Sequence, residues 1–361
     1  MSELLRRVRE MFPLFQADGV LVTHKANIRY ICGYTNDIGV LLVTGDSAYL
    51  LTDFRFVFQA QKEVDSRYVQ VVDVSDGGYP LTVMNLCRHN TPVAKLAIEA
   101  YEMPYLDYVG ITKELTANGI ETVPIPNYIS ELRFIKTPEE IEKLRMAEHI
   151  GDLAFSEILP YLKPGVTERE IAARLTFIMQ MHGASGNSFD PIVASGVNSS
   201  MPHAIPSEKK LEEGDFVTMD FGCIYQGYCS DMTRTVVLGK AGPKQKEIYE
   251  TVALAQEEAL KALKPGRKGR EIDAVARKII DDAGYKGCFG HGLGHSVGLE
   301  IHEDPFCNAR EERALKAGMI MTVEPGIYVK DFGGVRIEDM VLITEDGYEN
   351  LAHSEKKLIE L

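Results

Sequence analysis

Five residues that can bind metal ions, spread over more than a hundred positions, are the strongest chemical signal in this sequence. Each of the four carboxylates among them lies in a run rich in Val, Ile, Met and Phe that is typical of a buried strand. Four ionised carboxylates buried without partners would cost many kcal/mol, so buried acids are normally neutralised by cations. Few Lys or Arg lie in the same runs, and we therefore predict two divalent cations. The five residues are Asp220, Asp231, His295, Glu324 and Glu338.

The first two acids lie in predicted strands 216–223 and 229–238, which a short turn joins. A turn centred between Tyr225 and Gln226 would place Asp220 directly opposite Asp231, with Cβ atoms roughly 4.5–5.5 Å apart. Like charges at that spacing are unfavourable without a counter-ion. Thr233 falls on the same face of the hairpin, where we expect it to steady a carboxylate.

The last two acids repeat this arrangement in predicted strands 322–329 and 334–343. A turn centred at Asp331 would place Glu324 opposite Glu338, with Arg336 on the same face, whereas a slip of one residue would break the pairing. The acids could also be edge charges or members of unrelated salt bridges. That alternative suits one pair alone, but two pairs together with a group of histidines favour a metal centre.

The histidines lie in residues 290–303, GHGLGHSVGLEIHE. His291 and His295 have the spacing of metal ligands on a helix, but the interspersed glycines favour a glycine-rich strand that allows close approach of a ligand. The run lacks the HExxH pattern, and its GxGxG fragment is a weak phosphate-loop signal. The Asp-Phe-Gly triplet that begins at Asp220 lacks the other motifs of a protein kinase. Phosphate-loop and kinase functions are therefore excluded.

The composition is that of a globular protein of 361 residues, 45% hydrophobic and 25% charged, for which we predict two domains. A formal charge of −14 argues against nucleic acid or an anionic membrane as the main partner. Neither an apolar run of roughly 18 residues nor the pattern of a signal peptide is present. We therefore predict a cytoplasmic protein with no nucleic-acid or membrane partner. The six cysteines show no CxxC pair and are expected to be reduced thiols.

The order of predicted elements separates an N-terminal α/β domain, residues 1–130, from an α+β domain, residues 131–361. The N-terminal domain alternates strands with helices and contains no recognisable catalytic cluster. Thr137 and Glu140 form a capping box that opens a long amphipathic helix near the boundary. A second capping box, formed by Thr167 and Glu170, opens the next helix. Further helices are predicted over 243–263 and 269–283, with paired strands between and after them.

The sequence segments that contain these acids and histidines resemble those of the aminopeptidase P and prolidase (Xaa-Pro dipeptidase) branch of the pita-bread metallopeptidases. The resemblance covers the whole chain and implies a pita-bread catalytic domain preceded by a smaller creatinase-like α/β domain. Methionine aminopeptidases share the metal motif but lack such an N-terminal domain. The matching segments are 188–196, 202–203, 219–222, 230–235, 290–303, 323–328 and 335–339.

The resemblance implies a role for each candidate metal ligand. Asp220 would bind one metal, and His295 with Glu324 would bind the other. Asp231 and Glu338 would bridge the two ions. This oxygen-rich set suits Mn²⁺, with Co²⁺ or Zn²⁺ as alternatives. Glu324 is also the candidate for moving a proton between the attacking water and the leaving nitrogen.

The resemblance also implies that His203 and His302 contact the scissile carbonyl and the tetrahedral intermediate. His291, Tyr328 and Arg336 would shape the pocket for the residue after the cleaved bond. The expected enzyme is a metal-dependent exopeptidase that hydrolyses the Xaa-Pro bond at the N-terminus of peptides or in dipeptides. A homodimer is the assembly that the resemblance implies.

One departure from the family bears on the length of the substrate. Many relatives carry a basic residue shortly after the His-Glu pair, where this chain has Pro305-Phe306-Cys307-Asn308. A weaker grip on a C-terminal carboxylate would favour longer peptides over dipeptides, unless Arg336 or a partner chain supplies the charge. Two other functions of the same fold stay open, namely a non-catalytic peptide-binding module and a metal-independent creatinase-like hydrolase.

Overall fold

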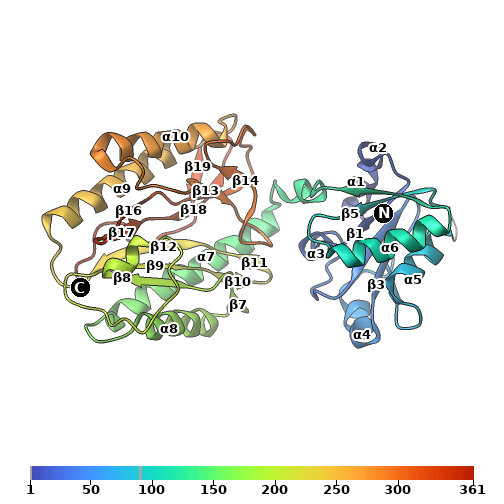
Figure 1. Ribbon diagram of the computed structural model, residues 1–361, viewed down its shortest axis with the longest axis horizontal. Helices are drawn as coiled ribbons and strands as arrows, with labels where there is room; N and C mark the ends of the chain where they lie inside the picture. Colours follow the sequence, from blue (N-terminus) through green and yellow to red (C-terminus); the bar gives the residue numbers. More distant parts are fainter. Residues whose placement is uncertain (1, 89–91) are drawn as a thin grey trace. The chain divides into compact units, whose positions relative to one another are not determined.

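The computed structural model describes residues 2–88 and 92–361, and the chain divides into two compact units. The N-terminal unit extends to Arg133 and the C-terminal unit begins at Phe134. The two units are coloured blue to green and green to red in Figure 1.

The N-terminal unit is built on a six-stranded mixed sheet with the strand order β4-β3-β2-β1-β5-β6. The antiparallel pairs are β1 with β2 and β2 with β3, and the remaining neighbours are parallel. Its strands are β1 (Gly19–Val22), β2 (Val40–Thr44), β3 (Ala48–Thr52), β4 (Gln70–Asp73), β5 (Lys95–Glu99) and β6 (Glu121–Ile125). Its helices are α1 (Glu3–Glu10), α2 (Phe12–Phe15), α3 (Lys25–Cys32), α4 (Phe54–Glu63), α5 (Gly78–Arg88), α6 (Tyr105–Ala117) and η1 (Ile129–Arg133).

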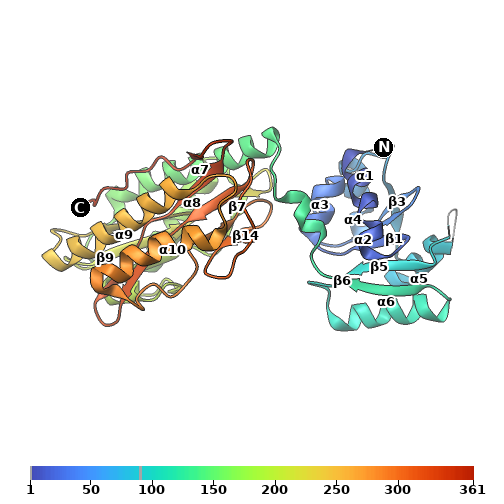
Figure 2. The same ribbon diagram turned by 90° about the horizontal axis from the view of Figure 1, so that it is seen from above.

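Helices cover both faces of this sheet because its strands are apolar on both sides. Val20 and Val22 of β1 join the core under α1, α3 and α4, whereas Leu21 joins the core under α5 and α6. Figure 2 shows α5 and α6 on the side of the sheet away from α1 and α4. The unit is therefore a three-layer α/β domain, as the sequence predicts.

The C-terminal unit consists of two halves, each with a pair of helices followed by antiparallel strands. Helices α7 and α8 pack on the strands of the first half, and α9 and α10 pack on those of the second. Figure 1 shows the strands between the two helix pairs. The helices are α7 (Pro138–Ile158), η2 (Leu159–Tyr161), α8 (Glu168–Met181), η3 (Gly196–Ser200), α9 (Pro243–Ala262), α10 (Gly269–Ile280) and the π-helical turn η4 (Asp281–Tyr285).

The strands of this unit form four small sheets with the orders β11-β10-β7, β12-β9-β8, β14-β13-β15-β18-β19 and β16-β17. The strands of the first half are β7 (Gly186–Asn187), β8 (Ile192–Ser195), β9 (Phe216–Phe221), β10 (Cys223–Tyr225), β11 (Tyr228–Cys229) and β12 (Met232–Val237). Those of the second half are β13 (Gly294–Ser296), β14 (Glu303–Cys307), β15 (Ile320–Val323), β16 (Gly326–Val329), β17 (Gly333–Arg336), β18 (Asp339–Ile343) and β19 (Tyr348–Asn350).

Both capping boxes predicted from the sequence are present. Thr137 accepts a hydrogen bond from the backbone N–H of Glu140, whose carboxylate accepts one in return at the start of α7. Thr167 and Glu170 do the same for α8. These reciprocal bonds satisfy N–H groups that a helix leaves unpaired at its start.

The long strands predicted from the sequence are interrupted. Each predicted hairpin consists of two short ladders, and the breaks fall at Gly222 and Ser230–Asp231 in one hairpin and at Glu324–Pro325 and Ile337–Glu338 in the other. Three of the four predicted acidic ligands therefore lie where the ladder is broken. A broken ladder frees the backbone to aim a side chain away from the sheet, as a β-bulge does.

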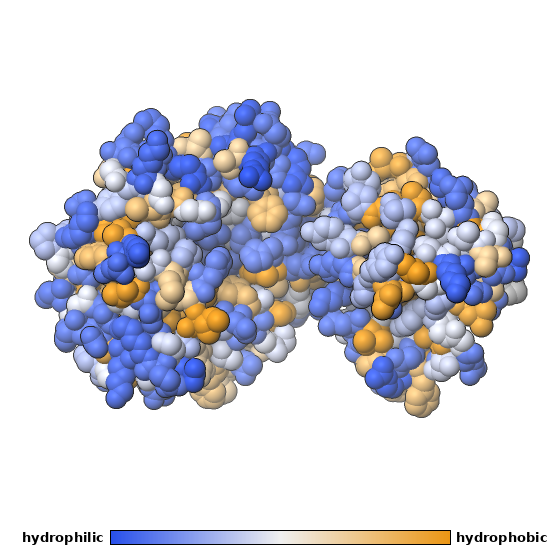
Figure 3. Space-filling view, in the orientation of Figure 1, coloured by the Kyte–Doolittle hydropathy of each residue, from blue (hydrophilic) through white to orange (hydrophobic). Residues whose placement is uncertain are grey.

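The surface of each unit is mostly hydrophilic, with apolar residues in small groups, on the face seen in Figure 3. Among the described residues, no helix is both long enough and apolar enough to cross a membrane. All six cysteines are free thiols.

Candidate metal centre

All five predicted metal ligands line a single cavity of about 360 Å³ in the C-terminal unit. His203 and His302 line the same cavity, and the rest of the wall is mostly apolar. The other lining residues are Phe189, Asp190, Pro191, Ile192, Ala204, Ile205, Pro206 and Ile301. The structure therefore brings together residues that lie more than a hundred positions apart in the sequence.

Asp220 and Asp231 are neighbours in the first hairpin, but the predicted register is wrong by two residues. The partner of Asp220 is Thr233, and the tight turn is centred between Gln226 and Gly227. The prediction centred the turn one residue too early. Side chains alternate between the two faces of a strand, so a shift of two residues keeps both acids on the same face of the hairpin. Asp231 is therefore a diagonal neighbour of Asp220.

Glu324 and Glu338 follow the predicted register. In the ladder nearer the turn Gly326 pairs with Arg336, and beyond the break Val323 pairs with Asp339. The same alignment therefore continues through the break and places the two glutamates across from each other. Both glutamates lie outside the ladders, in the gap between them.

The side chain of His295 extends from β13 into the cavity, and one hydrogen bond shows that its Nδ1 carries a proton. Nδ1 lies 3.0 Å from the carbonyl oxygen of Ser296, which can only accept, so Nδ1 carries the proton. Nε2 is therefore the ring nitrogen that faces the acids and can bind a metal. It lies 3.4 Å from a carboxylate oxygen of Asp231 and 3.6 Å from one of Glu324. This is the tautomer that a metal ligand requires.

The acids of the cavity form an environment that disfavours negative charge when no cation is bound. Burial raises the pKa of Asp231 and of Glu338 well above the usual carboxyl range, and repulsion among the neighbouring carboxylates raises both further. Burial also raises the pKa of Glu324 to about 7. Such shifts are the expected response of carboxylates that lack a counter-ion.

The donor set fits divalent cations. Ligand atoms of Asp231, His295 and Glu338 lie within 4.8 Å of one another. Oδ1 of Asp220 and Oε1 of Glu338 are buried without a hydrogen-bond donor among the described atoms. A buried carboxylate oxygen without a partner carries a large desolvation cost, which a bound cation would offset.

Arg336 connects the metal centre to the neighbouring pocket residues. Its Nη2 donates to Asp220 Oδ2 over 2.6 Å, and its Nε donates to the hydroxyl of Thr233 over 3.1 Å. The Thr233 hydroxyl in turn donates to Glu338 over 2.7 Å. Nη1 of Arg336 donates to the hydroxyl of Tyr328 over 2.8 Å. One guanidinium therefore orients an acid directly and reaches a second one through Thr233.

His291 continues this network beyond Tyr328. Its Nδ1 lies 2.8 Å from the carbonyl oxygen of Gly292 and its Nε2 lies 2.9 Å from the Tyr328 hydroxyl. The carbonyl requires the proton on Nδ1, so the Tyr328 hydroxyl donates to Nε2 while it accepts from Arg336. Burial, together with the charge of Arg336, lowers the pKa of His291 to about 4, which keeps the ring neutral. His291, Tyr328 and Arg336 lie beside the cavity and are not part of its lining.

His203 and His302 are the more exposed members of the site. The ring of His302 packs edge-on against His295, with 4.5 Å between the ring centroids. Burial and the neighbouring His295 lower the pKa of His302. His203 lies on the segment between η3 and β9 and is exposed. Both rings are therefore placed to contact a molecule in the cavity.

A buried ionic network that sequence reasoning missed supports the backbone of Glu338. Arg234 donates through Nη1 to the Glu338 carbonyl oxygen and through Nη2, over 2.8 Å, to Asp339. Asp339 also accepts from Lys356 over 2.6 Å and from Gln256 over 2.8 Å. Burial opposes ionisation of Asp339, yet the Arg234 and Lys356 charges and the hydrogen bonds hold its pKa below the usual value. A charged residue such as Arg234 amid a β-branched strand is the sequence signal that could have revealed this network.

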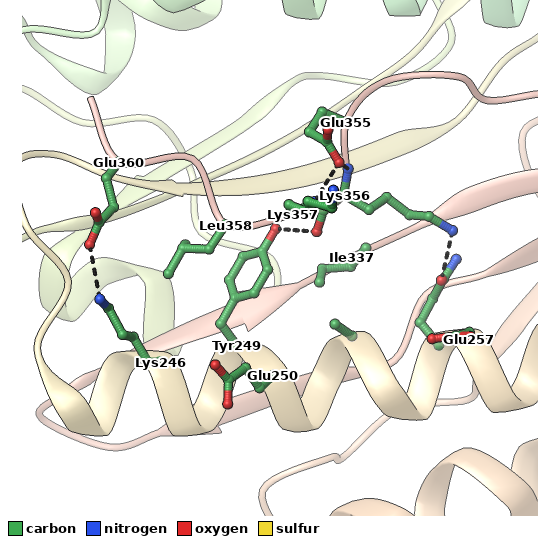
Figure 4. A pocket seen from close by; sticks show the side chains of 12 residues that line it. Lys246, Tyr249, Glu250, Glu257, Ile337, Glu355, Lys356, Lys357, Leu358 and Glu360 are labelled. Atoms are coloured by element: carbon green, nitrogen blue, oxygen red, sulfur yellow. Dashed lines mark hydrogen bonds and ion pairs between the residues drawn. The ribbon is translucent and has the colours of Figure 1, made fainter.

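The C-terminal segment that carries Lys356 runs beside α9 and bounds a separate groove of about 690 Å³. Figure 4 shows Tyr249 and Glu250 on the helix, with Leu358 and Glu360 on the segment. None of the predicted site residues lines this groove. Gln256 and Lys356 both line the groove and both donate to Asp339, which connects the groove to the buried ionic network.

Comparisons with known proteins give consistent results. Residues 5–135 match the creatinase/prolidase N-terminal domain, and residues 142–345 match metallopeptidase family M24. The chain is 40% identical to the Xaa-Pro dipeptidase of Pyrococcus furiosus, over 99% of this chain and all of that one.

Two solved structures extend these results. The Xaa-Pro dipeptidase from Bacillus anthracis superposes with a TM-score of 0.94 at 41% identity, over 99% of both chains. The X-Pro aminopeptidase from Thermotoga maritima superposes with a TM-score of 0.89 at 34% identity, over 98% of this chain and 100% of that one. The sequence prediction of a pita-bread domain behind a creatinase-like domain is confirmed.

Proposed function

This chain belongs to metallopeptidase family M24, and on that premise we propose that it is an Xaa-Pro dipeptidase that uses two divalent metal ions. The observation that carries the proposal is the convergence of four carboxylates and one correctly protonated histidine on a single cavity. The names of the relatives support the substrate class. Family membership itself supports metal-dependent hydrolysis.

The roles that we propose for the metal ligands follow the sequence prediction. Asp220 would hold one ion, His295 and Glu324 would hold the other, and Asp231 and Glu338 would be shared between them. Oxygen ligands with one imidazole favour Mn²⁺ over softer metals. When bound, the ions lower the pKa of a water molecule and polarise the scissile carbonyl, which amide hydrolysis requires.

The remaining residues handle the substrate and the protons. Glu324 accepts the proton of the attacking water and delivers it to the leaving nitrogen, as general acid–base catalysis requires. His302 and His203 donate hydrogen bonds to the carbonyl oxygen as charge develops on it. His291, Tyr328 and Arg336 form a hydrogen-bonded group beside the cavity, where their proposed role is to shape the pocket for the residue after the cut.

Proline chemistry explains why such a site is useful. The bond before proline is a tertiary amide without an N–H, so an enzyme that must hydrogen-bond that group handles it poorly. Attack by an activated water, with histidine donors on the carbonyl side, does not need the missing proton. The leaving nitrogen still has to be protonated, which is the task that we assign to Glu324.

The length of the substrate is the part of the proposal that needs a direct comparison. The relatives named as dipeptidases favour Xaa-Pro itself. The described residues that line the cavity include neither Lys nor Arg, which favours longer peptides unless the neighbouring Arg336 or a partner chain supplies the charge. Hydrolysis of Xaa-Pro and Xaa-Pro-Yaa, measured side by side, decides between the two.

The test uses purified protein that has been stripped with a chelator and then supplied with Mn²⁺, Co²⁺ or Zn²⁺. We expect hydrolysis of Xaa-Pro substrates to disappear on chelation and to return with metal, while Xaa-Ala controls are cleaved far more slowly. Activity that survives exhaustive chelation would support a metal-independent hydrolase. Binding without cleavage would support a peptide-binding module. Analytical ultracentrifugation of the same samples tests the homodimer that the resemblance implies.

A further inference from the structure

A buried carboxylate outside the cavity joins the two ends of the segment that carries His203. Glu168 is the first residue of α8 and its side chain is fully buried. Its two oxygens accept hydrogen bonds from three residues, all of which belong to residues 195–207, here called the His203 segment. These residues are Ser195, Asn198 and Ser207.

The two oxygens of Glu168 divide the two ends of the segment between them. Oε1 accepts from the backbone N–H of Ser195 over 2.7 Å and from its hydroxyl over 2.9 Å. Oε2 accepts from the backbone N–H of Ser207 over 3.0 Å and from its hydroxyl over 2.7 Å. The amide of Asn198 donates to both oxygens, over 3.1 and 3.2 Å. One carboxylate therefore holds positions that are twelve residues apart in the chain.

The residues between these anchors form part of the cavity wall. His203, Ala204, Ile205 and Pro206 all line the cavity. His203 is exposed and the side chain of Ile205 is 86% exposed, so burial contributes little to their placement. Their positions depend on where the segment is attached, because an exposed side chain on an irregular segment has few packing contacts to hold it.

The middle of the segment has its own attachments, to the second half of the unit. Arg336 donates to the carbonyl oxygen of Pro202 over 3.2 Å, and the backbone N–H of Gly334 donates to the hydroxyl of Ser199 over 2.8 Å. These contacts fix one side of His203 relative to β17. The far side, toward Ser207, is held to the body of the unit through Glu168 and the start of α8.

We propose that Glu168 is a positioning residue for the hydrolysis, because it ties both ends of the His203 segment and so places His203 over the cavity. The inference rests on the proposed function, in which His203 contacts the scissile carbonyl. Glu168 lies outside the cavity lining and acts through the segment. A carboxylate is required at this position because only acceptor oxygens can receive the backbone N–H groups of both ends at once.

The main test is Glu168→Gln in the full-length, metal-loaded enzyme. The amide offers one acceptor and one donor group, so it cannot accept from both ends of the segment. We expect kcat on Xaa-Pro substrates to fall by about tenfold or more, as a small misplacement of a catalytic group does. The affinity for Mn²⁺ is expected to stay unchanged, because the proposed metal ligands lie on other segments.

Matched variants separate this role from general damage to the fold. Glu170→Gln changes an exposed capping residue on the same first turn of α8 and does not touch the segment, so kcat should be unaffected. Asn198→Ala removes one donor and leaves the carboxylate in place. It covers the case in which Glu168→Gln does not fold, and we expect a smaller loss of kcat in the same direction.

A double-mutant cycle with His203→Ala decides whether Glu168 acts through His203. If it does, Glu168→Gln added to His203→Ala lowers kcat no further. Losses that multiply in the double variant, or an unchanged kcat in a folded and metal-loaded Glu168→Gln or Asn198→Ala, would overturn the proposal.

Hydrogen exchange provides a readout that is independent of activity. Peptides covering residues 195–207 should exchange faster in Glu168→Gln and Asn198→Ala than in the wild type, and at the wild-type rate in Glu170→Gln. Unchanged exchange in the first two variants contradicts the anchoring by Glu168. An inactive wild type with faster exchange in these variants would instead contradict the proposed function, and the role of Glu168 in the hydrolysis with it, while the anchoring stands.

Discussion

The two halves of the C-terminal unit position their carboxylates with hairpins of different geometry. Each half has two helices followed by a hairpin that supplies two carboxylates to the cavity. In the first hairpin, residues 216–237, Asp220 lies within a ladder and Asp231 lies in the break, so the acids are diagonal neighbours. In the second hairpin, residues 320–343, Glu324 and Glu338 both lie in the break and face each other.

The turn of each hairpin explains why the sequence predicted one register correctly and the other wrongly. The second hairpin turns through Asp331, with φ of 59°, which is the predicted centre. The first turns through Gln226 and Gly227, with φ of 49° and 91°. A two-residue hairpin turn of type I′ needs positive φ at both central positions, and glycine adopts it readily. The position of Gly227 was therefore the signal that should have set the register.

The two hairpins also differ in how their acids are neutralised by the protein itself. Asp220 pairs with Arg336 at 2.6 Å. Glu338 accepts from the Thr233 hydroxyl, and Glu324 lies nearest to His295. Asp231 of the first hairpin lies 3.4 Å from the same nitrogen of His295, so the difference between the hairpins is confined to Asp220 and its Arg336 partner.

The largest expected loss of activity comes from replacing the carboxyl group of Glu324. Glu324→Gln should lower kcat about 10²–10⁴-fold, since proton transfer as well as metal ligation is lost. Steady-state kinetics at saturating metal measures this loss. Asp220→Asn is the comparison in the first hairpin, and we expect high metal concentrations to restore part of its activity. Equal recovery of both variants by metal would contradict a separate proton-transfer role for Glu324.

The second prediction concerns the stability of the metal-free protein. The pKa of Glu324 rises from 4.5 to about 7 on folding, so its contribution to stability is complete below pH 4.5 and is lost as the pH rises to 7. Wild type should lose about 3 kcal/mol more free energy of unfolding over this range than Glu324→Gln. Urea unfolding at pH 4.5 and 7 in chelator measures the difference. Parallel pH profiles for the two proteins would show that Glu324 does not titrate in this range.

The third prediction concerns the network behind the second hairpin. Lys356→Met leaves Asp339 without one of its two cations and loosens the hold of Arg234 on the backbone of Glu338. The affinity for Mn²⁺ should fall about 10–100-fold, as it does when groups that orient metal ligands are removed. Metal titration followed by calorimetry measures this change. Lys357→Met, on an exposed neighbour, is the matched control, and an equal loss there would contradict a specific role for Lys356.

The smallest expected effects come from the two turns. Gly227→Ala forces a side chain into the left-handed region and should destabilise the protein by about 1–2 kcal/mol. Asp331→Gly removes a side chain from a similar conformation and should have no effect or stabilise slightly. Denaturant unfolding of both variants checks this contrast. A neutral Gly227→Ala would mean that the first turn does not fix its hairpin.

Local signals in the sequence were sufficient for much of the architecture. The capping boxes at Thr137 and Thr167 depend on residues three positions apart, and the structure contains both. The register of the second hairpin also depended on a nearby turn. Contacts between distant segments were beyond such signals. The supports given by Arg234 and Glu168 join residues from several elements, and no short motif contains both partners of these contacts.

The sequence by itself determined the five candidate ligands, because acids in apolar strands require counter-ions whatever their exact register. It also determined the family, through motifs that the comparisons support. Only the tertiary structure decided that Asp220 and Asp231 are diagonal neighbours, which nitrogen of His295 faces the acids, and how the His203 segment is anchored. Glu168 joins residues that lie 27 and 39 positions away in the chain, and the cavity brings acids of both halves together, so neither feature can be read from a short motif.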